Sequence, residues 1–311
     1  MMMAIEKQKS LAAWLSVVSN TSLVVGKVIV GIAIGSVSVI SEAIHSGIDL
    51  LAAVIALFAV KKSNLPADED HPYGHGKFEN VSGTVEALLI FVAAIWIIVE
   101  AIHKLITPQS VEEPGWGILL MLISAIVNTL VSQVLFKVGK KAQSIALQAD
   151  AWHLRTDVYT SLGVMVGLIS IWLCNRYLPG KDFRWIDPVA ALFVALLILK
   201  AAYELTVVAG RDLFDTSLPK EELRWIKKLL VHCPEAKGFH HLRTRKAGMH
   251  RYIEFHLVVG AKLTVAVSHE LTDELSDKIR GHFKDSHVTI HVEPCDNSSC
   301  TKHCLAGCFK K

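Results

Sequence analysis

Long apolar runs separated by short polar connections fill the first part of the chain. They lie near residues 11-35, 37-60, 82-104, 116-136, 146-174 and 186-208. A helix needs about 20 apolar residues to cross a bilayer core of about 30 Å, and each run reaches that length. The pattern therefore predicts an α-helical membrane protein with six transmembrane helices.

The pattern changes near Gly210, where segments typical of a soluble domain replace the apolar runs. An amphipathic helix is expected at about 220-232 and a second helix near 265-283. Strands are expected near 238-245, in the alternating segment 251-259 and at 287-294. This order, αββαβ, predicts a small open-faced α/β sandwich of the metallochaperone or ferredoxin-like type.

Composition agrees with a membrane protein and limits the partners. Hydrophobic residues make up 52% of the 311 positions, and the mean hydropathy is +0.41. The net charge of +3 is weak, and no basic run with interleaved aromatic residues indicates nucleic-acid binding. A soluble domain of roughly 80 residues buries only a modest core, so we expect it to pair with a second copy or to bind metal.

Lysine residues indicate the orientation in the membrane. They lie at the N-terminus (Lys7, Lys9), in the 61-80 connection (Lys61, Lys62, Lys77) and in the 137-141 connection (Lys137, Lys140, Lys141). By the positive-inside rule these segments are cytoplasmic, although Arg176, Lys181 and Arg184 in the 175-186 loop oppose it. We therefore predict four parts: a six-helix transmembrane domain at 1-210, a linker at 211-218, a cytoplasmic metal-binding α/β domain at 219-294 and a Cys-rich tail at 295-311, with both termini in the cytoplasm.

Two apolar runs each carry a histidine followed four residues later by an aspartate. The second run holds His45 and Asp49, and the fifth holds His153 and Asp157. Residues at this spacing share one helical face, and ionisable residues within a span face an internal cavity. If the two helices meet, two imidazoles and two carboxylates suit tetrahedral Zn²⁺. The alternative is a pair of interhelical hydrogen bonds that hold the bundle together.

The connection between the second and third runs gathers further ligand types. The segment PADEDHPYGHGKFEN contains Asp68, Asp70, His71 and His75, with Gly74 and Gly76 available for a tight turn. These residues predict a second, more exposed metal site. The alternative is a solvated polar loop.

These motifs together resemble the cation diffusion facilitator family of divalent-metal transporters, and the resemblance covers about residues 11 to 294. It implies a homodimer whose transport site is His45, Asp49, His153 and Asp157, with Asp68, His71 and His75 forming the loop site. Members with this His and Asp pattern are usually zinc transporters, and His153 stands where manganese-type relatives have Asp. The connection between the fourth and fifth runs is short, as in prokaryotic members.

The resemblance extends into the soluble domain. The segment GFHHLRTR resembles the family's GxHxLRxR strand, which implies a metal ligand at His240. Further implied ligands are His256, His269, His291 and Glu293, although Glu293 stands where several relatives have Asp. His241, His250, His282 and His287 match no motif and are expected to be surface residues. The match also implies that Lys77 and Asp215 form a charge pair that couples the domains.

Four cysteines crowd the tail as CDNSSCTKHCLAGC: Cys295, Cys300, Cys304 and Cys308. Thiols in the cytosol stay reduced, so metal capture by thiolates is favoured over disulfides. The spacing lacks the CxxC pairs of a zinc ribbon, and a tail without function is the alternative.

The function predicted from these residues is secondary active efflux of divalent cations, with zinc first, in exchange for protons by alternating access. No Walker loop and no HExxH motif is present, so neither ATP nor an enzymatic activity is expected. Zn²⁺ is the expected transported and regulatory ion, without an organic cofactor. The expected partners are a second copy, the lipid bilayer, divalent cations and protons, and the expected location is a bacterial inner membrane. Alternatives are a membrane-bound metal sensor or scaffold, or a transporter of iron, cobalt, nickel or cadmium.

Overall fold

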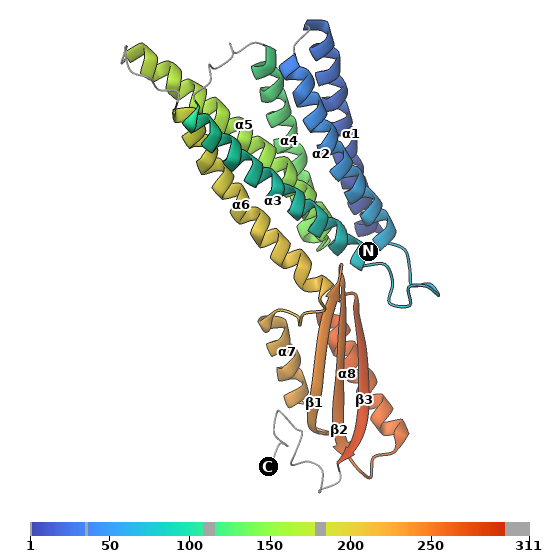
Figure 1. Cartoon of the computed structure of the whole chain (residues 1–311). Coiled ribbons are helices and arrows are strands. Elements are labelled where there is room, and N and C mark those ends of the chain that lie inside the picture. The colour runs from blue at the N-terminus through green and yellow to red at the C-terminus, as the bar shows by residue number, and fades with distance from the viewer. Residues whose placement is uncertain (1, 35–36, 108–115, 178–184, 296–311) are drawn as a thin grey trace. The chain divides into compact units, whose positions relative to one another are not determined.

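The computed structural model describes residues 2–34, 37–107, 116–177 and 185–295 (Figure 1). It divides into two compact units, Met1–Gly210 and Arg211–Lys311. The first is helical and the second is an α/β domain.

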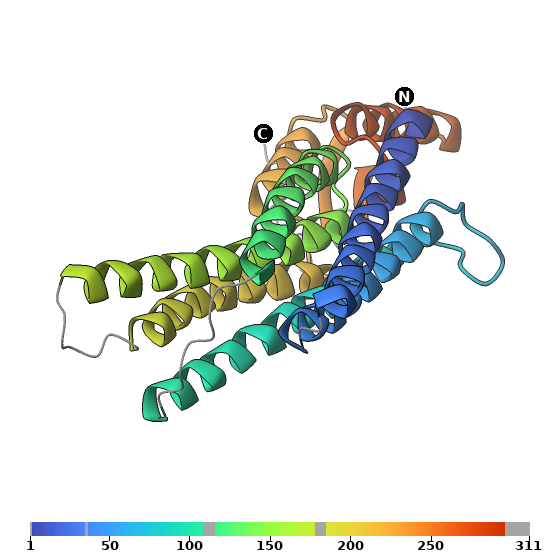
Figure 2. The ribbon, with the colours of Figure 1, turned by 90° about the horizontal axis from the view of Figure 1, so that it is seen from above.

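Six long helices build the first unit: α1 (Met2–Ile34), α2 (Val37–Ser63), α3 (Lys77–Ile106), α4 (Trp116–Lys141), α5 (Ile145–Tyr177) and α6 (Ile186–Leu213). Helices α1 and α2 pack side by side, as do α4 and α5 (Figures 1 and 2). Helix α5 also contacts both α2 and α3.

Four of these helices contain described stretches long and apolar enough to cross a membrane. The stretches are Ile5–Ala33, Lys77–Ile106, Met121–Lys141 and Pro188–Leu213. The described parts of α2 and α5 are interrupted by charged residues: Asp49, Lys61 and Lys62 in α2, and Asp150, Arg155 and Asp157 in α5. Four helices are therefore candidate membrane spans by length and composition, and crossing of the membrane by α2 and α5 stays a prediction.

Small residues let three of the helices approach closely. A Cβ atom at Gly83 of α3 would lie 2.5 Å from Ile145 Cγ2, and one at Gly163 of α5 would lie 2.7 Å from Val194 Cγ2. Ala87, Ala149 and Ala202 are fully buried in the cluster that joins α3, α5 and α6. Small side chains at helix contacts are typical of membrane bundles, where tight packing replaces the hydrophobic effect.

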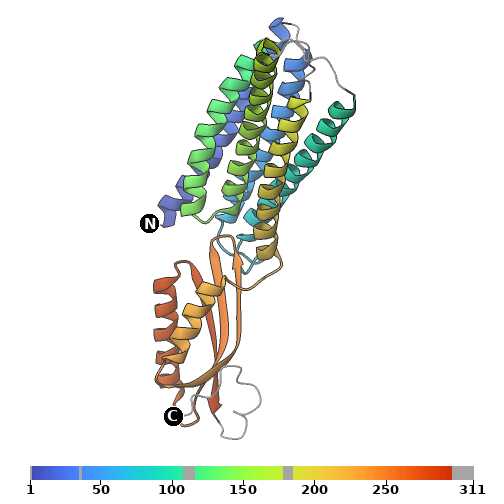
Figure 3. The same ribbon diagram turned by 90° about the vertical axis from the view of Figure 1, so that its left-hand side faces the viewer.

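The second unit has the predicted αββαβ order: α7 (Lys220–Val231), β1 (Ala236–Ala247), β2 (His250–Gly260), α8 (Val265–His282) and β3 (Ser286–Cys295). The strand order is β1-β2-β3, with β1 antiparallel and β3 parallel to β2. The parallel pair requires a crossover, which α8 provides. Both helices cover one face of the sheet (Figure 3).

Alternation along β2 divides the sheet into a core face and an open face. Ile253, Phe255 and Leu257 are almost fully buried against α7 and α8. The residues between them point to the opposite face, because successive side chains of a strand alternate. His256 therefore lies on the open face.

An ion pair ties α7 to the start of β2 and gives the second unit a pH dependence. Arg251 Nε donates to Glu222 Oε2 at 2.8 Å, and Nη2 donates to Oε1 at 3.0 Å. These hydrogen bonds hold the pKa of Glu222 below its ordinary value. A carboxylate with a lowered folded-state pKa stabilises the fold above its unfolded pKa, and this contribution is lost as the pH falls through the folded pKa.

We expect Glu222→Gln to destabilise this unit by about 1 kcal/mol at pH 7, after allowance for solvent screening. The difference from the wild type should vanish at acid pH, where Glu222 is protonated in both states. Protection of the α7 amides against hydrogen exchange measures both effects. The neighbouring Glu221→Gln is the control, because the Glu221 side chain is 88% exposed. A Glu222→Gln effect of equal size at both pH values would contradict an ionic origin.

Candidate metal centres

The first group of metal-ligand side chains lies between α2 and α5. Asp49, His153 and Asp157 each offer an atom, and these atoms lie within 4.8 Å of one another. His153 Nε2 is 2.9 Å from Asp49 Oδ1, and both side chains are buried. His45 lies on α2 one turn before Asp49, and its side chain is outside the described residues. The contact between α2 and α5 therefore brings three of the four predicted transport ligands together.

A polar cavity of about 200 Å³ adjoins this group. Its lining includes Asp49 and Asp157 together with Asn20, Lys27, Ser46, Ser124, Asn128, Thr160 and Ser161. Among the described residues, Ser124 Oγ and Asn128 Oδ1 are buried without a hydrogen-bond partner. Unsatisfied buried polar atoms are rare in folded proteins, so the cavity has the chemistry to hold water or an ion.

Lys27 is a cavity residue that reasoning from the sequence missed. It is 6% exposed, and its Nζ donates to Ser46 Oγ at 2.8 Å. A lysine within an apolar run was the available signal, because a buried ammonium usually faces a polar interior. Lys27 thus brings an amino group to the same cavity that Asp49 and Asp157 line.

The second group is in the loop before α3. Asp68, His71 and His75 each offer an atom within 4.8 Å of the others. Asp68 Oδ2 is 3.3 Å from His75 Nε2, and its Oδ1 is 3.2 Å from His71 Nδ1. The loop turns at Gly74, whose φ of +78° is favourable only for glycine. All three predicted loop ligands are therefore adjacent.

Two features prepare this loop group for a cation. The backbone N–H of His71 donates to Asp68 Oδ1 at 2.6 Å, and this hydrogen bond lowers the pKa of Asp68. His75 Nδ1 lies 3.2 Å from the carbonyl oxygen of Pro66, which can only accept. In the neutral ring Nδ1 therefore carries the proton and Nε2 presents its lone pair toward Asp68. The loop offers an ionised carboxylate and a correctly oriented imidazole.

The third group lies on the open face of the sheet in the second unit. His240, His256 and His291 form one row across β1, β2 and β3, because His256 pairs in register with both others. Glu293 reaches all three: its carboxylate is 2.7 Å from His256 Nδ1, 3.2 Å from His240 Nε2 and 3.6 Å from His291 Nε2. His240, His256 and Glu293 each offer an atom within 4.8 Å of the others.

The electrostatics of this group favour an ionised Glu293. Desolvation acts to raise the pKa of Glu293, but the hydrogen bond with His256 and the positive charge of the neighbouring imidazoles leave it below its ordinary value. His269, the remaining predicted ligand of this domain, lies on α8 with its Nε2 3.5 Å from Asp273 Oδ2. It is not one of the residues whose ligand atoms converge, so its role stays a prediction.

The remaining predicted residues are placed only in part. Cys295 ends β3, whereas Cys300, Cys304 and Cys308 lie outside the described residues. Lys77 begins α3 in the first unit, and Asp215 in the second unit lies 3.6 Å from Arg245. The tail site and the coupling pair both stay predictions.

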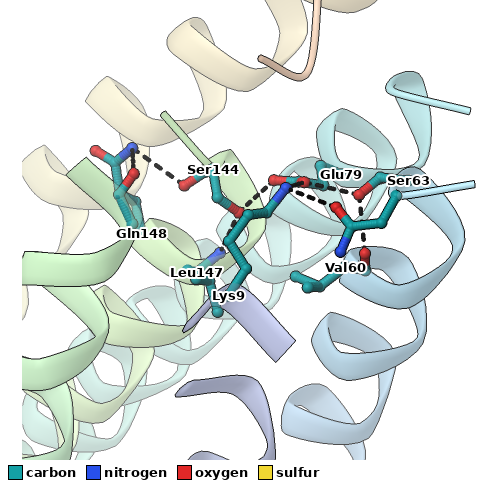
Figure 4. A network of polar contacts seen from close by, with 9 residues as sticks. Lys9, Val60, Ser63, Glu79, Ser144, Leu147 and Gln148 are labelled. Carbon is teal, nitrogen blue, oxygen red and sulfur yellow. Dashed lines mark hydrogen bonds and ion pairs between the residues drawn. The ribbon is translucent and has the colours of Figure 1, made fainter. Parts of the chain in front are cut away.

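A buried ionic network is the second feature that the sequence reasoning missed. Lys9 of α1 is paired with Glu79 of α3, and each side chain is 1% exposed. Glu79 also accepts hydrogen bonds from Ser63, at the end of α2, and Ser144, immediately before α5 (Figure 4). Lys9 Nζ donates in addition to Asn64 Oδ1 at 3.3 Å. One carboxylate therefore joins four helix ends, although Lys9 counted in the sequence only as an orientation signal.

Two family models match this sequence. The model of the cation efflux transmembrane domain matches residues 13–214. The model of the cytoplasmic domain of cation efflux proteins matches residues 218–295. Together they include the three groups of ligands described above.

Individual relatives match over most of their length. The uncharacterised transporter sll1263 of Synechocystis is 35% identical over 270 residues, covering 86% of this chain and 85% of the relative. The cation-efflux pump FieF of Citrobacter koseri is 32% identical over 263 residues, covering 84% of each chain. Among solved structures, the metal-bound C-terminal domain of the CzcD transporter from Thermotoga maritima is 32% identical. That match covers 25% of this chain and 94% of the solved one, with a TM-score of 0.23.

Proposed function

This chain belongs to the cation efflux family, and from that premise we propose that it exports zinc from the cytoplasm in exchange for protons. Membership makes it an integral membrane transporter of divalent metal cations with a cytoplasmic C-terminal domain, and not an enzyme. The choice of zinc and the coupling to protons are the proposed parts.

The observation that carries the proposal is the convergence of Asp49, His153 and Asp157 beside a polar cavity. Imidazole nitrogen and carboxylate oxygen are common zinc ligands, and we propose His45, which precedes Asp49 by one turn of α2, as the fourth ligand. Iron, cobalt, nickel and cadmium also accept such ligands, so the donor set ranks zinc first without excluding them.

Proton exchange follows from the same ligands. An imidazole or a carboxylate holds zinc only when it is deprotonated, so metal and protons compete for the same atoms. Zinc that enters from the cytoplasm displaces protons, and protons from the far side displace zinc after the site reorients. Rocking of helix groups around a fixed central site provides alternating access, as in other secondary carriers.

The surrounding architecture completes the proposal. We propose a homodimer in a bacterial inner membrane, in which each chain crosses the membrane six times and has both termini in the cytoplasm. Each chain then consists of a transmembrane domain at 1-210, a linker at 211-218, a cytoplasmic metal-binding domain at 219-294 and a Cys-rich tail at 295-311. The loop and cytoplasmic groups bind zinc in a regulatory role, and the Cys-rich tail captures metal.

A membrane-bound metal sensor is the second candidate, and the cytoplasmic group favours it. His240, His256 and Glu293 lie together outside the membrane unit, where they can bind metal without moving it. This function predicts a protein that binds zinc but moves none.

Flux into proteoliposomes distinguishes the two functions. The purified protein is reconstituted with a zinc-reporting dye inside, and zinc is added outside with and without an imposed pH gradient. We expect zinc entry that rises when the lumen is more acidic than the outside, because luminal protons then displace the metal and leave in exchange. A rate of zinc entry that is the same with and without the pH gradient would refute proton coupling. Zinc binding without entry would support the sensor function. Parallel assays with iron, cobalt, nickel and cadmium rank the cargo.

A further inference from the structure

Strand β1 contains an irregularity beside the cytoplasmic metal group. The register of β1 against β2 shifts between His240 and Arg243. Phe239 and Leu242 both pack into the core on the helix-covered face, although residues three apart in a regular strand point to opposite faces. A bulge resolves this conflict by placing both intervening residues, His240 and His241, on the open face.

The backbone of His241 has an unusual conformation at this bulge. Its φ of +50° lies in the left-handed region, which is uncommon for residues other than glycine and which His, Asn and Asp tolerate best. Unfavourable backbone conformations of this kind cluster at functional sites, where the surrounding structure maintains them. The exposed His241 side chain is thereby turned toward the metal group instead of the core.

The rings of His240, His241 and His256 form a nearly equilateral triangle. Their centroids are 4.8 Å apart for His240 and His241, 5.0 Å for His241 and His256, and 5.0 Å for His240 and His256. Two imidazoles bound to one tetrahedral zinc by Zn–N bonds of about 2.0 Å have centroids about 5 Å apart. The ring centroids therefore have the separation of imidazole ligands on one ion, and His241, whose ring atoms are not among those that already converge, would reach the ion by rotation of its exposed side chain.

We infer that His241 is a metal ligand of the cytoplasmic group, where it joins His240, His256 and Glu293 in holding one Zn²⁺-like cation. Glu293 supplies the fourth donor, since its carboxylate already contacts His240 and His256. Four donors from three strands complete a tetrahedral shell within one chain. The inference rests on the proposed function in one respect: this group is taken to bind the same class of metal that the protein transports.

The test follows zinc binding at this group in the full-length protein. Hydrogen exchange with mass spectrometry reports zinc-dependent protection of peptides from 236–260 and 286–295, separately from the membrane helices. We compare the wild type with His241→Asn, because asparagine tolerates a positive φ but lacks the imidazole. The control is His287→Asn on β3, whose ring stacks on Tyr252 at 4.9 Å.

We expect His241→Asn to raise the zinc concentration at half-protection about tenfold or more, because even outer partners of metal ligands contribute that much to affinity. His287→Asn should leave the midpoint unchanged, and His241→Asp should recover part of the affinity through its carboxylate. Equal midpoints for the wild type and His241→Asn would overturn the inference, as would wild-type peptides that gain no protection. A variant has kept its fold if its hydrogen exchange, measured without zinc, equals that of the wild type.

This outcome is independent of transport. If zinc protects the peptides against exchange in a His241-dependent way but the protein moves no zinc, the proposed function is refuted and His241 remains a ligand. If the protein moves zinc normally but the midpoint of protection is the same in His241→Asn, the ligand is refuted and the proposed function remains.

Discussion

Replacing Asp49 with alanine is expected to abolish metal transport while leaving a folded protein. The substitution removes a carboxylate whose Oδ1 lies 2.9 Å from His153 Nε2 and whose side chain borders the polar cavity. Loss of an outer partner alone weakens metal binding by about 10- to 100-fold, so loss of a direct ligand should lower flux at least as far. Zinc entry into proteoliposomes measures the effect.

A matched variant separates this effect from a general change of charge. Glu204→Ala removes a carboxylate from α6, where the Glu204 side chain is 63% exposed and pairs with Lys200 at 3.9 Å. It should transport like the wild type. Gel filtration of both variants checks that the protein is intact. Retained zinc flux in Asp49→Ala would mean that Asp49 and His153 serve as a helix clasp instead of a transport site.

Glu79→Ala is expected to destabilise the membrane unit by about 3–5 kcal/mol, which is the usual result of leaving one buried charge without its partner. Lys9 would then keep an ammonium group that is 1% exposed, and among the described residues Asn64 Oδ1 would be its remaining side-chain acceptor. The hydroxyls of Ser63 and Ser144 would also lose their shared acceptor. Thermal unfolding of the detergent-solubilised protein should show a large drop in midpoint.

Two further variants test the origin of that drop. Glu69→Ala removes an exposed carboxylate from the nearby loop and should change the unfolding midpoint little. The double variant Lys9→Met and Glu79→Leu removes both charges and should recover much of the stability, because an apolar pair of similar size avoids the desolvation penalty. A double variant as unstable as Glu79→Ala would show that packing, and not the unpaired lysine, accounts for the loss.

Local patterns in the sequence located most of the elements. The alternation in 251-259 and the period of 220-232 placed β2 and α7 within one residue of their ends. Helices α1 and α3 begin earlier than the apolar runs, at Met2 and Lys77, because a helix continues past the bilayer core while hydropathy records only the apolar part. These features are encoded by neighbours in the sequence.

Contacts between residues far apart in the sequence could not be predicted from such local patterns. The spacing of His153 and Asp157 indicated a ligand face, but their proximity to Asp49 depends on contact between α2 and α5. The pairing of Lys9 with Glu79 joins residues 70 positions apart, and neither residue type signals a partner. His241 was expected to be a surface residue and its side chain is exposed, but no pattern in the sequence reveals the bulge that turns this side chain toward the metal group.

The network around Glu79 also restricts the relative motion of the helix ends that it joins. It fastens the ends of α1, α2, α3 and α5 to a single carboxylate, so sliding any of them there would expose an unpaired charge to a dry interior. A rearrangement of the bundle that keeps these four helix ends in contact with Glu79 therefore costs less than one that separates them.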